Sequence, residues 1–469
     1  MRLNTSLWLA AAALAAGCGG GGGGSDAVVV APPAPAPAPA PAPVTPPPAP
    51  APVDTVSPAP APTPAPTPAP VEPGCTQAEQ QQSLLAYMRQ QYFWADRMAA
   101  GNPSALTIDA YFQSLLFKPL DRYSYTEPTA AFNQRFTEGR RIGYGYSLAW
   151  DEAAGTLQVR YVEPLSPVAR AGLKRGDFVI SIDGFTPSQV MAGQVATVTT
   201  VGVPRVIVVR DASGAQRGIQ VASEDFALTP VAAQATHTVA RSDGSTVRVG
   251  YLAYHQFVTY SANDLANAFS VFRAEGATEV VLDLRYNSGG AVNTARDVAS
   301  HIGGTTTMNR IFASLRFNAQ MQGANQDYLF APSIATAMRR VVVITSTETA
   351  SASELLINGL KPHVPVVLVG QTTFGKPFGF IPRASCGTTF NAVLFETVNS
   401  QNVGGFTSGF APDCAVADDL TRALGDPQER RLRAALNYIG TGQCGALAAP
   451  VKGRVVPAGE VNPVGMFVR

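Results

Sequence analysis

A hydroxyl, a carboxylate and an ammonium group occur close together in the sequence, and together they could carry out acyl transfer. Ser351 and Glu354 lie in the segment TASASE, and Lys376 follows Ser351 by 25 residues in the segment TTFGKPFG. A serine hydroxyl becomes an effective nucleophile when a base takes its proton. A lysine can be that base when burial lowers its pKa toward neutrality. Three apolar residues flank the lysine and could provide this burial: Phe374, Phe378 and Phe380.

Three buried strands must position these groups. From about residue 223 onward strands alternate with helical stretches, which predicts an α/β layer structure. Continuous apolar and β-branched runs at 278–284, 341–345 and 364–369 predict parallel strands that are covered on both faces. Each run is followed by a loop, and in an open parallel sheet such loops lie together at the carboxyl edge. We therefore expect the three loops to meet.

The first of these loops is a glycine turn with the sequence RYNSGG. Gly289 and Gly290 permit a close approach of the main chain, so the N–H groups of Gly289 and Ala352 could form an oxyanion hole. Ser351 is predicted to lie at the start of a helix, where free N–H groups and the helix dipole favour developing negative charge.

Each of these residues also has a purely structural interpretation. A serine at a helix start is most often an N-cap, and a loop lysine is usually a solvated surface charge. Ser353 is a second candidate for the nucleophile because it lies in the same segment, whereas His255 lies in a predicted strand and is expected to be structural. The sequence has four histidines and no Cys-x-x-Cys spacing, so neither a metal nor another cofactor is expected.

Residues 141–222 follow a different pattern, with short predicted strands, a short predicted helix and glycine-flanked loops. One stretch resembles the PDZ domains of bacterial proteases: SPVARAGLKRGDFVISIDG. This resemblance implies a domain that adds a peptide to its sheet as an extra strand and holds the terminal carboxylate with loop N–H groups. The loop expected to hold the carboxylate consists of Gly143, Tyr144, Gly145 and Tyr146.

Three motifs in this order resemble the carboxy-terminal processing (tail-specific) serine peptidases. They are LDLRYNSGG, TASASE and TTFGKPFG, and the resemblance covers residues 75–425. It implies an α/β protein of several domains, with a crotonase/ClpP-like protease core, an inserted PDZ domain and a small N-terminal helical unit. The roles that it implies are nucleophile for Ser351, general base for Lys376, polar support for Glu354, and oxyanion donors for the N–H groups of Gly289 and Ala352.

Two positions near the lysine depart from the family pattern. Phe380 stands where several members have a glutamine that orients the lysine, and Pro377 replaces a glycine. We therefore expect another group to orient Lys376, either the carboxylate of Glu354 or a main-chain carbonyl.

The N-terminus predicts an exported protein. Arg2 precedes an apolar run at 7–16, which is too short to span a bilayer as a mature helix. The segment LAAGC resembles a bacterial lipobox, which implies lipidation of Cys18; an ordinary secretory signal peptide is the alternative. The expected location is the bacterial outer membrane, where the lipid anchors a chain that faces the periplasm or the cell surface. The formal net charge of +1 and the lack of a basic stripe argue against nucleic acid as a partner.

Four cysteines follow Cys18, and in an oxidising compartment an even number predicts two disulfides. Three connectivities are open. Cys75 opens the predicted folded region and Cys444 nearly closes it, so we expect the pairs Cys75–Cys444 and Cys386–Cys414.

These features divide the chain into six parts. They are a lipoprotein signal peptide (1–18), a Gly- and Ala-Pro-rich linker (19–74), an N-terminal helical region (75–137), a PDZ domain (141–222), a Ser-Lys peptidase core (223–445) and a C-terminal tail (446–469). Because proline favours extended polyproline II structure, the linker is expected to be a semi-rigid spacer.

The expected function is a serine endopeptidase that cleaves exported proteins near their C-termini after binding an apolar C-terminal tail. A weakly active or inactive lipoprotein scaffold that captures peptides is the alternative, and Phe380 in place of the glutamine is its main support. A crotonase-type acyl-CoA enzyme ranks third, because it explains neither the PDZ-like region nor the export signal.

Overall fold

The structure, a computed structural model, describes residues 74–333, 335–446, 455–459 and 465–468. The predicted signal peptide, the predicted lipidation site at Cys18 and nearly all of the predicted linker lie outside these residues. Within the described ranges, no helix is long and apolar enough to cross a membrane.

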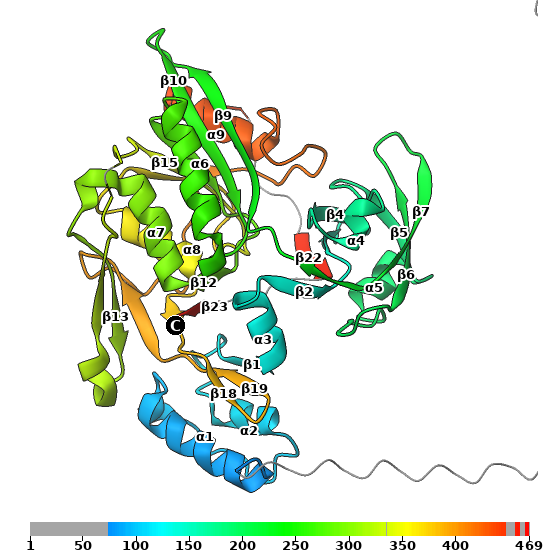
Figure 1. Cartoon of the computed structure of the whole chain (residues 1–469), viewed down its shortest axis with the longest axis vertical. Coiled ribbons are helices and arrows are strands. Elements are labelled where there is room, and N and C mark those ends of the chain that lie inside the picture. The colour runs from blue at the N-terminus through cyan, green and yellow to red at the C-terminus, as the bar shows by residue number, and fades with distance from the viewer. Residues whose placement is uncertain (1–73, 334, 447–454, 460–464, 469) are drawn as a thin grey trace, which may run out of the picture. The chain divides into compact units, whose positions relative to one another are not determined.

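The described chain begins with helices and one short strand (Figure 1). These elements are α1 (Gln77–Gln91), the 3₁₀ helix η1 (Ala95–Arg97), α2 (Ile108–Leu115), β1 (Tyr125–Pro128) and α3 (Thr129–Phe136). Thr76 and Glu79 form a capping box at the start of α1. The helix ends before Tyr92, which turns into the core and donates its hydroxyl to the buried Asp121 at 2.7 Å.

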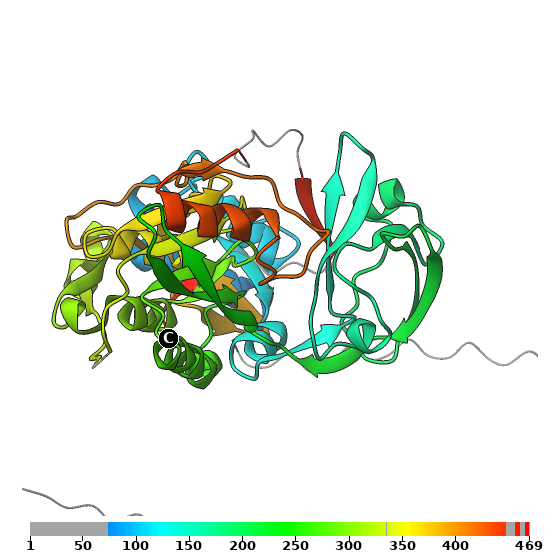
Figure 2. The ribbon, with the colours of Figure 1, turned by 90° about the horizontal axis from the view of Figure 1, so that it is seen from above.

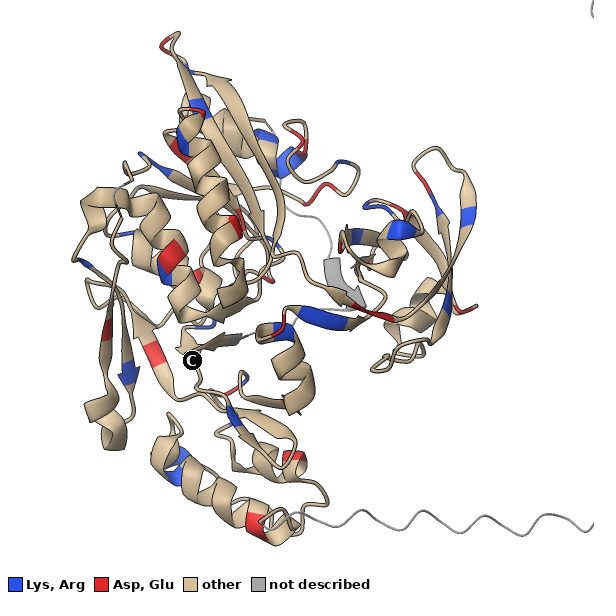
Figure 3. Cartoon of the chain, viewed as in Figure 1, with Lys and Arg blue, Asp and Glu red and all other residues tan. Residues whose placement is uncertain are grey.

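Residues 146–222 form a small β-domain, in which five antiparallel strands each pair with the next around an apolar interior. Its elements are β3 (Tyr146–Asp151), β4 (Thr156–Val162), α4 (Pro167–Arg170), β5 (Phe178–Ile182), α5 (Pro187–Met191), β6 (Pro204–Arg210) and β7 (Gln216–Ala222). The strands that lead into and out of this domain, β2 (Arg140–Gly143) and β8 (Glu224–Ala227), pair with each other. Figure 3 shows opposite charges along these two strands, and an ion pair joins Arg140 to Asp225 at 3.0 Å.

A sheet of six strands lies at the centre of the core domain, in the order β21-β16-β15-β11-β10-β9. These strands are β9 (Val231–Ala240), β10 (Thr246–Tyr254), β11 (Glu279–Asp283), β15 (Val341–Thr345), β16 (Val366–Gly370) and β21 (Cys414–Ala415). All neighbours are parallel except β9, which runs antiparallel to β10 at the edge. The three strands predicted from the sequence are β11, β15 and β16, and their parallel arrangement as neighbours is confirmed.

Helices cover both faces of this sheet, and Figure 2 shows α9 on the opposite face from α6. The helices are α6 (Ala262–Ala274), α7 (Val292–Gly303), α8 (Ala352–Leu360) and α9 (Arg430–Thr441). Successive side chains of a strand point to opposite faces. In β11, Val280 and Leu282 therefore pack with α6, α7 and α8, while Val281 packs with α9.

The remaining short elements lie outside the central sheet. They are η2 (Thr259–Ser261), β12 (Gly289–Ala291), η3 (Gly304–Thr307), β13 (Ile311–Phe317), η4 (Ala319–Ala324), β14 (Gln326–Leu329), β17 (Phe378–Gly379), β18 (Arg383–Ser385), β19 (Thr388–Asn391), β20 (Phe395–Val398), β22 (Val455–Gly459) and β23 (Gly465–Phe467). Strands β14, β13, β20 and β17 form one small sheet, and β1, β19 and β18 form another.

The two disulfides join other pairs than those predicted. Cys75 is bonded to Cys386 and Cys414 to Cys444, with Cα–Cα distances of 5.6 and 5.4 Å, so the predicted pairs Cys75–Cys444 and Cys386–Cys414 are wrong. Cys386 lies in the turn between β18 and β19, and this hairpin pairs with β1 beside the start of the folded chain. Cys414 begins the edge strand β21, and its side chain shares an apolar cluster with α9 and Cys444. Packing between distant segments, rather than position along the chain, decides the pairs.

Candidate active site

The turn between β15 and α8 holds Ser351 in an uncommon main-chain conformation. Its φ is 62° and its ψ is −114°, a region that residues other than glycine rarely adopt. The side chain is fully buried, and its Oγ has no hydrogen-bond partner among the described residues. Strained turns between a strand and a helix present the nucleophilic serine in other hydrolases. The conformation and the unpartnered hydroxyl therefore mark Ser351 as a functional candidate.

Lys376 is completely buried. Burial lowers the pKa of Lys376 to about 7, although the negative charges of Asp121 and Glu354 act in the opposite direction. The Nζ atom lies 4.0 Å from the centroid of the Phe380 ring and 3.5 Å from the carbonyl oxygen of Tyr123. Near neutral pH a large fraction of Lys376 is therefore uncharged and able to accept a proton.

The carboxylate of Glu354 connects the loop of Ser351 to the loop of Lys376. Its Oε2 accepts the main-chain N–H groups of Ser351 at 2.9 Å and of Lys376 at 2.8 Å. Its Oε1 accepts the N–H of Gly375 at 2.7 Å and the hydroxyl of Thr373 at 2.5 Å. Burial raises the pKa of Glu354, and these four hydrogen bonds oppose that shift. Because its contacts include the main chain of both loops, Glu354 sets their relative position.

Residues 121–124 are a part of the site that sequence reasoning missed. The carbonyl of Tyr123 faces the Nζ of Lys376, and the hydroxyl of Tyr123 donates to the carbonyl of Gly375 at 2.8 Å. Asp121 is buried and accepts the N–H groups of Tyr123 and Ser124, each at 2.9 Å. The main-chain carbonyl that orients the lysine therefore comes from the end of the helical unit.

Arg122 adds a second connection between this segment and the lysine loop. Its guanidinium donates to the carbonyls of Phe374 at 3.2 Å and Thr407 at 3.0 Å. Tyr123 and Lys376 are 253 positions apart, and no spacing rule connects them. The sequence offered one signal, the polar cluster Asp-Arg-Tyr-Ser at the end of a helical region.

A hydrogen bond joins Ser353, the other candidate nucleophile, to the glycine turn. The hydroxyl of Ser353 donates to the carbonyl of Asn287 at 3.0 Å, so Ser353 has a structural contact that Ser351 lacks. The side-chain oxygen of Asn287 accepts the N–H of Gly289 at 2.9 Å. In this structure the Gly289 N–H is therefore engaged, and its predicted use as an oxyanion donor requires Asn287 to release it. Ala352 is the buried first residue of α8.

The loop predicted to hold a peptide carboxylate lies between β2 and β3. Gly143 ends β2, and Tyr144 and Tyr146 are buried, with ring centroids 6.3 Å apart. Gly145 has a φ of 86°, and a Cβ at this position would lie 2.0 Å from the Cβ of Ser166. Only glycine fits there. In the structure this loop packs closely against Ser166. Its role in binding a carboxylate stays a prediction.

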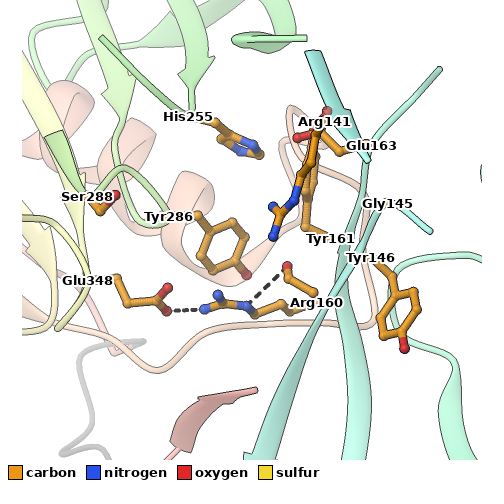
Figure 4. A pocket seen from close by; sticks show the side chains of 11 residues that line it. Arg141, Gly145, Tyr146, Arg160, Tyr161, Glu163, His255, Tyr286, Ser288 and Glu348 are labelled. Carbon is orange, nitrogen blue, oxygen red and sulfur yellow. Dashed lines mark hydrogen bonds and ion pairs between the residues drawn. The ribbon is translucent and has the colours of Figure 1, made fainter. Parts of the chain in front are cut away.

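An ionic interface joins the small β-domain to the core domain, as Figure 4 shows for part of it. Arg160 of β4 forms an ion pair with Glu348, which lies in the turn that leads to α8. Arg175 donates to the hydroxyl of Tyr286 at 2.7 Å and forms an ion pair with Asp418 at 3.2 Å. The small β-domain therefore contacts the loops that carry the candidate residues.

His255 lies at this interface in the pocket of Figure 4. Its ring is 4.1 Å from the ring of Tyr161, and burial together with the charges of Arg160 and Arg175 lowers its pKa to about 3. The imidazole is therefore neutral near pH 7, and it packs between the domains, in agreement with the structural role expected from the sequence.

Two family models match this chain. Residues 248–416 match the model of peptidase family S41, and residues 79–125 match the peptidase S41 N-terminal domain. The first match contains the candidates Ser351 and Lys376. The second match ends at residue 125 and therefore includes Tyr123.

Several proteins and solved structures are similar to this chain. The carboxyl-terminal-processing protease of Synechocystis sp. is 26% identical over 334 residues, which are 69% of this chain and 73% of that protein. The chloroplastic carboxyl-terminal-processing peptidase 3 of Arabidopsis thaliana is 28% identical over 253 residues, 51% of this chain and 46% of that protein. The crystal structure of a putative S41 protease from Bacteroides fragilis has a TM-score of 0.61 and 24% identity, and the match covers 76% of this chain and 96% of that one. This likeness shows a shared mixed α/β fold.

The matches and the fold define the class: this chain is a serine-type peptidase, a hydrolase. More narrowly, the chain matches the models of peptidase family S41 over residues 248–416 and 79–125, and it is similar to carboxyl-terminal processing proteases. The prediction of a serine peptidase is thereby confirmed.

Proposed function

We propose that this chain is an endopeptidase that cleaves exported proteins near their C-termini, with Ser351 as nucleophile and Lys376 as general base. The observation that carries the proposal is the buried lysine with a pKa of about 7, on a loop that shares one carboxylate with the loop of the buried Ser351. A base with a pKa near the working pH is the most effective proton acceptor at that pH.

In the proposed reaction, neutral Lys376 takes the proton of the Ser351 hydroxyl as Oγ attacks the scissile carbonyl carbon. The N–H of Ala352, at the start of α8, stabilises the resulting oxyanion, together with the Gly289 N–H once Asn287 releases it. Lys376 then gives its proton to the departing amine, and the C–N bond breaks. A water molecule resolves the acyl-enzyme, and Lys376 again serves as base. Burial of both side chains excludes bulk water from the first step.

The small β-domain is proposed to act as a PDZ domain that binds the apolar C-terminal tail of the substrate. Two observations support this role. The chain's own β22 adds to the edge strand β3 in antiparallel register, as a peptide ligand would. A cavity of about 730 Å³, within the usual range for a ligand pocket, lies beside β3 and α5, lined by Leu148 and Val190 among others.

The N-terminal part of the proposal concerns location. We propose that Cys18 is lipidated after export and that the proline-rich linker holds the peptidase away from the outer membrane. Labelling of the full chain with a radioactive fatty acid in a bacterial host tests this part, and a Cys18→Ser variant is expected to carry no label.

The catalytic proposal is tested with the full chain and an unstructured protein that ends in an apolar tail. Ser351→Ala and Lys376→Arg are expected to abolish cleavage, because alanine lacks the nucleophilic hydroxyl and arginine stays protonated and cannot serve as a base. Ser353→Ala is the matched control, since it removes only the hydroxyl that is bonded to Asn287, and it is expected to retain most of the activity. Full activity of Ser351→Ala would contradict the assignment, and tail binding with no turnover would favour the scaffold instead.

A further inference from the structure

The C-terminal segment of this chain lies as an added strand on two different sheets. Its first part, β22, pairs antiparallel with β3, from Val455 opposite Asp151 to Gly459 opposite Ser147. The segment therefore runs toward Tyr146 and the loop before it. Figure 1 shows β22 at the small β-domain and β23 beside β12. Addition of an extended segment to a sheet edge is the way in which such domains bind peptides.

The second part, β23, lies between the two loops of the candidate active site. On one side it pairs in parallel with β12, and Gly290 stands opposite Met466. On the other side the N–H of Phe380 donates to the carbonyl of Met466 at 2.9 Å, and the N–H of Val468 donates to the carbonyl of Phe380 at 3.1 Å. The strand is thus held by the residues that follow the Gly289 turn and by the residue four positions after Lys376.

The site that β23 occupies, between β12 and Phe380, is called its seat below, and it is closely packed. Met466 is completely buried, and Phe467 is 3% exposed. The Phe467 ring lies 4.8 Å from the ring of Phe136 and 5.7 Å from the ring of Phe132. These contacts belong to an apolar cluster that also contains Val258, Ala291 and Phe380. Apolar packing therefore adds to the main-chain hydrogen bonds that hold β23 in place.

The main chain around this seat is shaped to receive a strand. Gly290 has a φ of 135°, and a Cβ at that position would lie 2.1 Å from the carbonyl oxygen of Phe257. The Phe257 carbonyl also accepts the N–H of Ala291 at 2.8 Å, and the N–H of Phe257 donates to Gly289 at 3.0 Å. Phe257 thus occupies one edge of β12, so the other edge is the one open to an added strand. In the structure the chain's own C-terminus takes that edge.

We propose that residues 455–459 and 465–468 form a built-in inhibitory peptide, which occupies the path that a substrate tail must follow from β3 to the active site. The inference rests on the proposed peptidase function, because it assigns to that site an intramolecular competitor. The ligand class is an extended peptide with apolar side chains where Met466 and Phe467 lie, held mainly through its main chain. A substrate reaches β12 only after β23 leaves it.

The expected size of the effect follows from competition. A segment tethered by a short linker acts at an effective concentration of roughly 1 mM. If the free segment binds with a Kd of about 100 μM, the closed form exceeds the open form by about tenfold. Release of the segment should then raise kcat/KM for a protein substrate by about tenfold.

A single substitution tests this release in the full chain. Val468→Pro removes the N–H that donates to the Phe380 carbonyl, while proline keeps the extended conformation of the residue before it. Val468→Ala is the matched control, since it keeps that N–H. We expect kcat/KM to rise severalfold in Val468→Pro and to stay within twofold of the parent in Val468→Ala.

A deletion of residues 447–469 gives the second test. The deletion variant should cleave the same substrate about tenfold faster than the full chain, and a synthetic peptide of residues 455–469 should inhibit it competitively. In the Ser351→Ala background, the fluorescein-labelled peptide should bind the deletion variant and bind the full chain much more weakly. Thermal unfolding reports whether the deletion variant is folded; if it is not, the pair of Val468 variants decides.

The outcomes separate the two proposals. Ser351-dependent cleavage at equal rates in the full chain, the deletion variant and Val468→Pro, with no inhibition by the peptide, overturns the inhibitory role and leaves the peptidase function standing. Loss of all Ser351-dependent cleavage overturns the catalytic proposal. In that case binding of the peptide to the deletion variant still supports a binding site for the C-terminal segment. Lack of binding to that variant overturns the binding site as well.

Discussion

The carboxylate of Glu354 accepts the main-chain N–H of Lys376 at 2.8 Å. The same oxygen accepts the N–H of Ser351 at 2.9 Å, so a single atom relates the two loops. The Nζ of Lys376 contacts the Phe380 ring, four residues along the chain, and the carbonyl of Tyr123, which comes from the N-terminal helical region. The carboxylate thus positions the loops, whereas burial lowers the pKa of Lys376.

Substitution of this carboxylate should reduce activity more than stability. In Glu354→Gln, one acceptor oxygen is replaced by an NH₂ group that faces main-chain donors, so one loop shifts. Misplacement of reacting groups by about 1 Å costs roughly a hundredfold in rate, and we expect a fall in kcat of about 10- to 100-fold. Steady-state kinetics with parallel thermal unfolding check this expectation. Glu275→Gln, at an exposed ion pair with Arg248, is the control and should leave kcat unchanged.

The rate should depend on pH through Lys376. Its pKa is lowered to about 7, and the neutral form, which is the base, becomes dominant above that pH. We therefore expect kcat/KM to rise tenfold per pH unit below about pH 7 and to level off above it. A profile measured between mildly acidic and alkaline pH tests this. A flat profile across neutrality would rule out a lysine base with this pKa.

The free energy of unfolding should also depend on pH through Lys376. The usual pKa of lysine is 10.5, so between about 7 and 10.5 the unfolded chain binds more protons at this position than the folded chain. The free energy of unfolding therefore rises with pH over this window. Lys376→Met removes the group, so the variant should be more stable than the parent at pH 7, with an advantage that shrinks toward pH 10.5. Chemical unfolding of both proteins at several pH values checks the sign, and an advantage that grows with pH would contradict it.

Asp121 should tune the base from the N-terminal side. Its charge acts to raise the pKa of Lys376, and its Oδ1 accepts the N–H groups of Tyr123 and Ser124. Asparagine can still accept those hydrogen bonds but carries no charge, so Asp121→Asn should move the acidic limb of the pH profile to lower pH. We expect a displacement of about 0.5 to 1 pH unit. The exposed Asp109→Asn serves as the control, and an unmoved profile in Asp121→Asn would show that its charge does not reach the lysine.

The disulfide pairs predict both a peptide map and a difference in stability. A non-reducing digest should contain Cys75 linked to Cys386 and Cys414 linked to Cys444. The first bridge closes 311 residues and the second closes 30. Loop-closure entropy then makes loss of the first bridge about 2 kcal/mol more costly than loss of the second. Double Cys→Ala variants of each pair, compared by thermal unfolding, test this order. A greater loss from the second pair would contradict the entropic account.

Local sequence patterns are enough to predict the elements that carry the chemistry. The strands β11, β15 and β16 could be predicted because buried parallel strands need continuous apolar runs. The place of their loops at one edge followed from the parallel order. The low pKa of Lys376 was expected from the phenylalanines around it, because desolvation is a local effect of neighbouring apolar residues.

The distant segments that complete the site are visible only in the folded chain. The carbonyl of Tyr123 beside Lys376, the pairing of Cys75 with Cys386, and the C-terminal strand between β12 and Phe380 join positions far apart in the chain. No periodicity or spacing encodes such contacts, since they depend on how whole helices and hairpins pack. The hydroxyl and the base could therefore be named from the sequence, whereas the groups that orient the base and the segment that covers it follow from the fold.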